Sequence, residues 1–314
     1  MMQVHTDPSR LPAFRNAVVT IGTFDGVHEG HRAILRKLCD TARETGGESV
    51  IITFHPHPRV VVGRQHRIDL LTTMPERIGL LREEDVDHLV VIPFDDRFAA
   101  MEATAYVTDF LVGLFHPSVI IIGYDHRFGK GRQGDYRLLE ALAPTHGFTV
   151  QEIPEQLLDA AAVSSTRIRE ALRAGRVDEA NANLGYPYFF EGTVVKGDQR
   201  GRTIGFPTAN IHLDDPDKLV PANGVYAVTV NILGGEMEGG LRKGMMNIGV
   251  RPTVDGSHRT IEVHLLDFEG DLYGKRLLVA LKAHLREEKK FGSLDELKAQ
   301  LAADKVHTLQ VLAY

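Results

Sequence analysis

The feature of this sequence that most constrains its fold is a change of pattern near residue 185. Before it, short apolar runs alternate with stretches whose apolar residues recur at helical spacing, which is typical of a parallel sheet covered by helices. This half of the chain is therefore predicted to be a doubly wound α/β domain. We expect buried strands at residues 18–21, 49–54, 88–92, 119–122 and 148–153. We expect helices at residues 31–44, 75–84, 104–115, 135–143 and 165–173.

After residue 188 the sequence consists of strand-like runs separated by glycine-rich turns, with no helix between them. Such a series favours an antiparallel sandwich or barrel. The boundary is placed at the sequence LGYP, residues 184–187, so we predict an α/β domain over residues 14–184 and an all-β domain over residues 185–314. The runs lie at residues 189–195, 225–232, 244–250, 260–268 and 276–284, and one helix is expected after them, at 294–302.

Charge and cysteine content narrow the class of protein. Acidic residues outnumber basic ones by 42 to 36, so the formal net charge is −6, and the chain has no general attraction to nucleic acid or anionic lipid. Any phosphate binding must therefore be local. The single cysteine, Cys39, cannot form an intrachain disulfide, and the N-terminal segment contains no long apolar run. We expect a cytoplasmic protein that binds neither nucleic acid nor membrane.

Two histidines stand where the first expected strand passes into the first expected helix, in the sequence GTFDGVHEGH at residues 22–31. A helix N-terminus presents unpaired N–H groups and the positive end of the helix dipole, so a glycine-flanked turn at this place can bind an anion. His28 and His31 would project the same way and add two donors. We expect the anion to be a phosphate, whose developing charge during nucleotidyl transfer the imidazoles would stabilise. Two surface histidines on a capped helix are the alternative.

Two further segments of the first half carry residue types that bind phosphate. The sequence SSTRIR at residues 164–169 stands at an expected helix start and combines capping hydroxyls with arginines. The alternative there is an ordinary capped helix with solvated arginines. The loop at residues 123–135 contains the pattern GxGxxG from Gly129 to Gly134. A dinucleotide fingerprint needs its first glycine directly after a strand, and here residues 124–128 intervene, so NAD binding is disfavoured.

The second half contains a glycine-rich loop that leads into the sequence PTAN at residues 207–210. Small residues at Gly197 and Gly201 let backbone N–H groups approach a phosphate. Thr208 and Asn210 supply oxygen ligands of the kind that Mg²⁺ accepts. A β-hairpin with a proline turn is the alternative.

Residues 261–265 alternate strictly between apolar and polar, so Glu262 and His264 share one face of a strand. A carboxylate fixed on a rigid strand suits a general base that takes a proton from a hydroxyl. A solvated strand face with paired charges is the alternative.

The motifs of the first half resemble a known family when they are taken together. GTFDGVHEGH, FHPHP at 54–58, GxDxxFGxGxxGD at 123–135 and SSTRIRE at 164–170 resemble, in order and spacing, the nucleotidyltransferase module of bacterial bifunctional riboflavin kinase/FAD synthetases. The HxGH core alone is shared with pantetheine-phosphate and nicotinamide-nucleotide adenylyltransferases. The resemblance implies a Rossmann-like nucleotidyltransferase domain with a parallel sheet, in which His28 and His31 are catalytic. The implied ATP-binding residues are Gly22, Thr23, Phe24, Asp25, His28, His31, Asp125, Arg127, Ser164, Thr166 and Arg167.

The second half resembles riboflavin kinase from end to end, in GxVVKGxxxGRxxGFPTANI from residue 192, GVYAV at 224–228, NIGVRPT at 247–253, IEVHLLDF at 261–268 and LREEKKF at 285–291. The resemblance implies a Greek-key β-barrel with a C-terminal helix, with ATP and Mg²⁺ as cosubstrates and Glu262 as the base. The implied kinase residues are Gly197, Gly201, Arg202, Thr208 and Asn210 for ATP, Thr208 and Asn210 for the metal, and Glu262, Arg286 and Phe291 for the flavin.

Together these observations predict a bifunctional transferase. In the second domain, Glu262 would take a proton from the terminal ribityl hydroxyl of riboflavin, which attacks the γ-phosphorus of ATP and gives FMN. In the first domain, the FMN phosphate would attack the α-phosphorus of a second ATP, which gives FAD and pyrophosphate. Two other interpretations stay open: a first domain that adenylylates another substrate, and a protein that binds flavin without catalysis.

Overall fold

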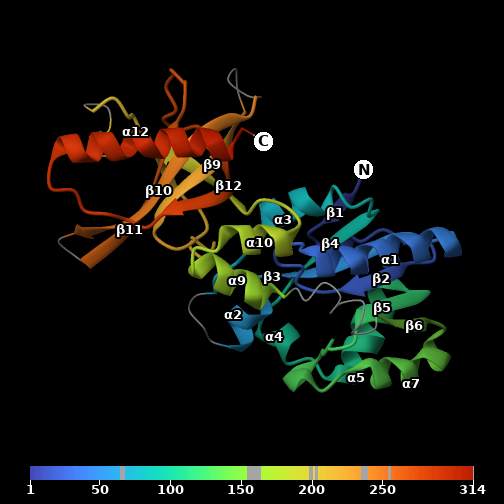
Figure 1. The fold of residues 1–314 in the computed structure, drawn as a ribbon. Coiled ribbons are helices and arrows are strands. Elements are labelled where there is room, and N and C mark those ends of the chain that lie inside the picture. The colour runs from blue at the N-terminus through green and yellow to red at the C-terminus, as the bar shows by residue number, and fades with distance from the viewer. Residues whose placement is uncertain are drawn as a thin grey trace. The chain divides into compact units, whose positions relative to one another are not determined.

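The chain folds into two compact units, Met1–Ser165 and Thr166–Tyr314 (Figure 1). The computed structural model describes residues 1–63, 68–153, 164–197, 201, 204–234, 240–253 and 256–313. None of the helices within those ranges combines the length and the apolar character needed to cross a membrane.

A six-stranded sheet forms the centre of the first unit, with the strand order β1-β4-β3-β2-β5-β6 (Figure 1). Every neighbouring pair is parallel. Consecutive residues of the inner strands are buried, because both faces of the sheet are covered. The predicted doubly wound domain is therefore confirmed. The strands are β1 Gln3–His5, β2 Val18–Ile21, β3 Ser49–His55, β4 His88–Pro93, β5 Val119–Gly123 and β6 Thr149–Ile153.

The strand order reverses between β2 and β5, and this reversal determines where a ligand can bind. In an open parallel sheet, the loops that leave the carboxyl ends of two such strands diverge and leave a crevice between them. The loop after β2 contains the GTFDGVHEGH sequence, and the loop after β5 contains the glycine-rich sequence. Two of the three predicted phosphate-binding segments of the first half therefore flank the switch point of the sheet.

The helices of the first unit occupy the predicted stretches and several short ones in addition. The predicted helix at 104–115 is continuous, but its middle part is π-helical, and there Tyr106 stacks on Phe128 with 4.9 Å between ring centroids. The helices are α1 Glu29–Thr45, α2 Pro58–Val62, α3 Met74–Leu81, α4 Asp96–Ala99, α5 Ala103–Ala105, the π-helix Tyr106–Val112, α6 Gly113–Phe115 and α7 Tyr136–His146, with 3₁₀ turns at Pro8–Arg10 and Lys130–Arg132.

The second unit is a closed antiparallel barrel with the strand order β10-β11-β8-β7-β12-β9. Of the two predicted architectures, the barrel is the one that forms. The short strand β8 was not predicted; it has four residues and begins inside the PTAN segment, at Ala209. The strands are β7 Phe189–Val195, β8 Ala209–His212, β9 Gly224–Leu233, β10 Arg242–Thr253, β11 Gly256–Leu265 and β12 Arg276–Arg286.

The C-terminal helix α12 spans Leu294–Val311 and is therefore longer than the predicted 294–302. The residues that it buries in its second half include the polar Asp304 and Thr308, which are 4% and 0% exposed. An apolar period cannot reveal a helix whose buried positions are polar, so the sequence pattern ends too early.

Two helices, α9 Ser165–Arg173 and α10 Val177–Leu184, precede the barrel and pack on it. The Ala222 N–H donates to the Leu172 carbonyl at 2.9 Å, and the Asn181 amide donates to the Leu281 carbonyl at 3.0 Å. From Thr166 onward these helices belong to the second compact unit. The predicted boundary between residues 184 and 185 implies that residues 185–314 fold as a separate domain. It stays a prediction.

We expect a fragment of residues 185–314 to fold as a barrel but to be less stable than a fragment of residues 166–314. The shorter fragment loses the contacts of α9 and α10, whose apolar side chains are buried. The midpoint of thermal unfolding, followed by circular dichroism, should be at least about 5 °C lower for the shorter fragment. Equal midpoints would show that the two helices add nothing to the barrel.

Candidate active sites

The loop between β2 and α1 follows an unusual backbone path. Phe24, Gly26 and Val27 have φ angles of 47°, 87° and 36°, in the left-handed region that only glycine adopts at little cost. Val27 is β-branched and fully buried, so its conformation is strained and must be held by its surroundings. Strained residues of this kind concentrate at functional sites.

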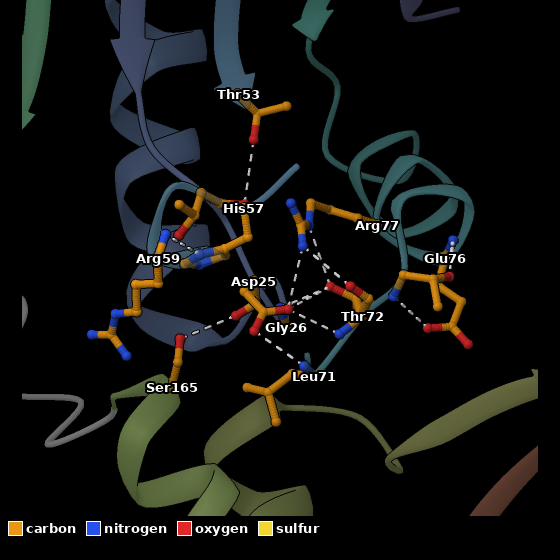
Figure 2. A network of polar contacts seen from close by, with 12 residues as sticks. Asp25, Gly26, Thr53, His57, Arg59, Leu71, Thr72, Glu76, Arg77 and Ser165 are labelled. Carbon is orange, nitrogen blue, oxygen red and sulfur yellow. Dashed lines mark hydrogen bonds and ion pairs between the residues drawn. The ribbon is translucent and has the colours of Figure 1, made fainter. Parts of the chain in front are cut away.

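The carboxylate of Asp25 holds this loop against the segment that precedes α3 (Figure 2). Asp25 is 1% exposed and accepts hydrogen bonds from the backbone N–H groups of Leu71 and Thr72 at 3.1 and 2.9 Å. The Thr72 hydroxyl donates to the same carboxylate and accepts from the Gly26 N–H at 3.0 Å. The buried guanidinium of Arg77 lies 3.4 Å from Asp25. Asp25 thus anchors the loop, and its predicted role in binding ATP stays a prediction.

His28 and His31 lie together at the N-terminus of α1, as their spacing predicts. His28 is the N-cap residue, and its Nδ1 accepts the His31 backbone N–H at 3.4 Å. The two rings are stacked, with centroids 3.7 Å apart and an interplanar angle of 18°. Because Nδ1 of His28 is an acceptor, the proton of its neutral ring is on Nε2. The cap therefore selects the tautomer that presents an Nε2 donor.

Two other segments meet this loop at the carboxyl edge of the sheet. The Thr53 hydroxyl donates to the Thr23 carbonyl at 3.3 Å, and the Ser165 hydroxyl donates to the Asp25 carbonyl at 3.1 Å (Figure 2). Ser165, the last residue of the first unit, is therefore hydrogen-bonded to the strained loop. The predicted phosphate ligands Ser164, Thr166 and Arg167 flank this serine and are exposed, and their contacts with ATP stay predictions.

The glycine-rich loop after β5 is closed on itself. The Phe128 N–H donates to the Gly134 carbonyl at 3.1 Å, and the Gly134 N–H donates back at 2.9 Å. A Cβ at Gly129 would collide with Ala103, and one at Gly134 would collide with the Phe128 ring. The internal packing of the loop accounts for the GxGxxG pattern without a dinucleotide.

The polar residues of that loop differ in their surroundings. Asp125 and Arg127 are exposed, and Arg127 forms an ion pair of 3.2 Å with Asp135. Burial lowers the pKa of His126 to about 4, so its ring is neutral near pH 7. Within the described residues, its Nε2 is shielded from solvent and makes no hydrogen bond.

Glu262, Thr208 and Asn210 meet on one face of the barrel wall. Asn210 of β8 lies directly opposite Glu262 of β11, and the Thr208 hydroxyl donates to Glu262 Oε2 at 3.1 Å. The strand neighbours of Glu262, Ile261 and Val263, are buried in the core. The predicted alternation of polar and apolar faces is confirmed. It leaves the three polar residues half-buried on the outer side of the wall.

Two glycines that precede PTAN, Gly197 and Gly201, pack closely on their neighbours. A Cβ at Gly197 would collide with the Asn210 amide, and one at Gly201 would collide with the Phe206 carbonyl. The predicted ATP ligand Arg202 lies outside the described residues. The side-chain oxygens of Thr208, Asn210 and Glu262 are hard donors, a set that fits Mg²⁺, which takes a few protein oxygens and completes its shell with water and phosphate.

His264 contacts Pro207 and Phe206, the two residues that precede Thr208. Its Nδ1 lies 2.7 Å from the Pro207 carbonyl oxygen, and its ring meets Phe206 edge-on with centroids 5.3 Å apart. Burial lowers the pKa of His264, although the bond to the Pro207 carbonyl opposes the shift. His264 lies on the same strand face as Glu262, as predicted. Unlike Glu262 it is buried, and it contacts Phe206 and Pro207.

A pocket opens beside Thr208, next to the barrel wall. Most of the residues that line it are apolar in type, but polar atoms make up about half of its surface, and Asp271 is its one charged lining residue. Apolar and aromatic walls beside a hydroxyl suit a purine base whose phosphates reach the PTAN segment. The lining residues are Val194, Pro207, Thr208, Ala209, Val263, Leu265, Phe268, Gly270, Asp271, Leu272 and Tyr273.

Two of the three predicted flavin-binding residues, Arg286 and Phe291, lie together where β12 leads toward α12. Arg286 forms a paired hydrogen bond with the Asp304 carboxylate, through Nε at 3.0 Å and Nη2 at 2.7 Å. Its guanidinium lies 5.9 Å from the centroid of the Phe291 ring. The C-terminal helix therefore fixes the position of Arg286, and contact of either residue with a flavin stays a prediction.

Sequence reasoning missed the contribution of Thr72 and Arg77 to the first site. One signal was present: Thr73 and Glu76 have the Thr-x-x-Glu spacing of a capping box. The structure contains that box, with the Thr73 N–H donating to Glu76 at 2.8 Å. The pattern marks where α3 begins, but it cannot show that the residues around it bind Asp25.

Both units gather side chains of the kinds that can bind a nucleotide phosphate, an arrangement that suits a two-domain transferase of the nucleotide-using class. Family models identify it further. The model described as FAD synthetase matches residues 11–167, and the model described as riboflavin kinase matches residues 184–312. The chain belongs to the family of bifunctional riboflavin kinase/FMN adenylyltransferases.

Similar proteins support that membership along nearly the whole chain. The bifunctional riboflavin kinase/FMN adenylyltransferase of Escherichia coli K12 is 41% identical over 92% of this chain and 90% of its own length. The protein of the same name from Bacillus subtilis is 35% identical over 99% of this chain and 98% of its own length. A crystal structure described as a macrolide-efflux protein from Streptococcus pneumoniae has a TM-score of 0.85 and 32% identity, and the match covers 98% of each chain.

Replacing Asp25 by alanine should destabilise the first unit strongly. The substitution leaves the buried guanidinium of Arg77 without its carboxylate, and the loss of one partner of a buried ion pair typically costs about 3–5 kcal/mol. The free energy of unfolding from denaturant titrations measures the effect.

The matched control is Glu102→Ala, which removes an exposed ion pair with Lys130 and should cost less than about 1 kcal/mol. A loss for Asp25→Ala as small as that of the control would refute the role of Asp25 as an anchor.

Proposed function

We propose that this protein makes FAD from riboflavin in two ATP-dependent reactions. The barrel unit phosphorylates riboflavin to FMN, and the first unit transfers AMP from ATP to FMN with release of pyrophosphate. The observation that supports the proposal is that each unit brings together side chains of the kinds that can bind phosphate. His28 and His31 are stacked at a helix N-terminus, and Glu262 lies 3.1 Å from the Thr208 hydroxyl. Proteins of this family that match the chain end to end are named for both activities.

In the first unit, the FMN phosphate oxygen attacks the α-phosphorus of ATP, and the bond to the pyrophosphate oxygen breaks. Negative charge grows on the α-phosphoryl oxygens and on the leaving group. His28 donates from Nε2, because its Nδ1 is held by the helix cap. Preorganised donors of this kind stabilise the transition state more than the ground state, and no covalent enzyme intermediate is needed.

In the barrel unit, Glu262 accepts the proton of the terminal ribityl hydroxyl as that oxygen attacks the γ-phosphorus of ATP; the bond from the γ-phosphorus to the bridging oxygen breaks, and ADP leaves. The strand holds the carboxylate in position, and Thr208 orients it through a hydrogen bond. Thr208 and Asn210 would hold Mg²⁺, which supplies charge neutralisation to the phosphates when it is bound. The adenine lies in the pocket beside Thr208, between residues such as Phe268 and Tyr273.

The location and cofactor follow from this activity. We expect the protein to work in the cytoplasm with Mg²⁺–ATP as cosubstrate, and with riboflavin and FMN as its flavin substrates. Incubation of the pure protein with riboflavin, ATP and Mg²⁺, followed by separation of the flavins, tests the proposal. Formation of FMN without FAD would show that the first unit adenylylates another acceptor, and recovery of unchanged riboflavin would favour a flavin-binding protein.

His28→Ala and His31→Ala should each abolish FAD formation from FMN while FMN formation from riboflavin continues. Loss of a positioned donor to a developing charge typically costs about a hundredfold or more in turnover. The rates of both reactions are measured on each variant. His307→Ala, an exposed histidine of α12, serves as the control and should leave both rates unchanged. An effect below about threefold for both site variants would remove the histidines from the mechanism.

Glu262→Gln keeps the size of the side chain and removes its basic site. Riboflavin turnover should fall by about a hundredfold or more, while FMN adenylylation and the midpoint of thermal unfolding stay close to those of the unchanged protein. Glu191→Gln is the control, since Glu191 is a barrel-strand glutamate in an ion pair with Arg276. A variant that unfolds more easily but keeps its turnover would assign Glu262 to a structural ion pair instead.

A further inference from the structure

A third polar residue stands beside Glu262 on the outer face of the barrel. Asn247 of β10 lies directly opposite Glu262 in the β10–β11 ladder, just as Asn210 of β8 does on the other side. Directly opposed residues of antiparallel strands project from the same face, with Cβ atoms about 4.5–5.5 Å apart. The ladder therefore sets Asn210, Glu262 and Asn247 in one row, with the carboxylate in the middle.

Asn247 lies on this face although its strand neighbours belong to the core. Met246 and Ile248 are 0% exposed, while Asn247 is half-buried. Its amide makes no hydrogen bond to any residue in the described part of the chain. A half-buried amide without a protein partner contributes little to the stability of the folded state, but it can bind a ligand.

On the side away from Glu262, Asn247 lies close to a second acidic side chain, that of Glu288. Gly249 is the next residue of β10 on the same face, and a Cβ there would collide with Oε1 of Glu288 and would lie 3.1 Å from the Asn247 amide nitrogen. The Asn223 amide holds the other Glu288 oxygen at 3.4 Å. The absence of a side chain at Gly249 thus leaves Asn247 between two carboxylates, those of Glu262 and Glu288.

We propose that Asn247 is a positioning residue of the kinase reaction and that its amide binds a secondary hydroxyl of the ribityl chain. This inference rests on the proposed kinase function and deepens it. Riboflavin presents a polyol whose terminal hydroxyl reacts at Glu262, so the secondary hydroxyls must lie next to that carboxylate. A hydroxyl both donates and accepts, and an amide offers a donor and an acceptor to match. Asn247 stands one strand away from the reacting group, within reach of those hydroxyls.

The experiment compares two substrates on the full-length enzyme. One is riboflavin, and the other is a flavin whose 5-hydroxypentyl side chain keeps the terminal hydroxyl but lacks the secondary ones. The wild-type enzyme should have a higher kcat/KM for riboflavin than for the deoxy flavin. Asn247→Ala should lower kcat/KM for riboflavin by about tenfold, the worth of one neutral hydrogen bond to substrate, and should leave kcat/KM for the deoxy flavin and KM for ATP nearly unchanged.

The design separates a positioning role from a structural one. A structural role would lower kcat/KM for both flavins by the same factor, and that result would overturn the inference, as would an unchanged preference for riboflavin. Asn231→Ala is the matched control, because Asn231 is a half-buried asparagine of β9 that pairs with Leu278 and lies outside the row. If the alanine variant fails to fold, Asn247→Leu keeps the side-chain volume and gives the same comparison.

Failure of the underlying kinase proposal gives a different result. In that case the unchanged enzyme phosphorylates neither flavin, whereas failure of the inference leaves an active kinase whose preference does not depend on Asn247.

Discussion

The first unit depends on one buried carboxylate. Asp25 lies in a loop that contains left-handed φ angles at Phe24 and Val27, which neither residue type favours. The free energy needed to hold that path comes from the hydrogen bonds that Asp25 accepts from Leu71 and Thr72 and from its contact with Arg77. Because these donors are buried, the carboxylate has no competing water. The position of His28 at the start of α1 follows from this anchor.

The anchor also explains how a parallel sheet acquires a site of defined shape. Asp25 binds the loop after β2 to the segment that precedes α3, and the Ser165 hydroxyl donates to the Asp25 carbonyl of the same loop. The loop after β5 takes its shape from its own Phe128–Gly134 pairing. Two independently braced loops at the switch point give rigid walls, which is what positioning of an attacking phosphate oxygen requires.

In the barrel, the register of the strands holds the polar side chains in position. One face of β10 and β11 supplies core residues such as Ile248 and Val263, and the other face carries Asn247 and Glu262. A slip of one residue would exchange the two faces, so burial of the apolar set fixes the polar row. The arrangement of this polar row is therefore maintained by the hydrophobic core on the opposite side of the same strands.

Local patterns in the sequence determined most of the longer elements, the two fold classes and the places of the histidine pair and of Glu262, because periodicity and capping act over a few residues. They did not reveal α10, the short strand β8 or the second half of α12, where buried Asp304 and Thr308 interrupt the apolar period. Only the tertiary structure decided which distant groups meet. Asp25 binds Thr72, which is 47 residues away in the sequence, and Thr208 binds Glu262, which is 54 residues away. Such contacts depend on strand order and barrel closure, which no local pattern encodes, and the row that joins Asn247 to Glu262 exists only because β10 pairs with β11 in this register.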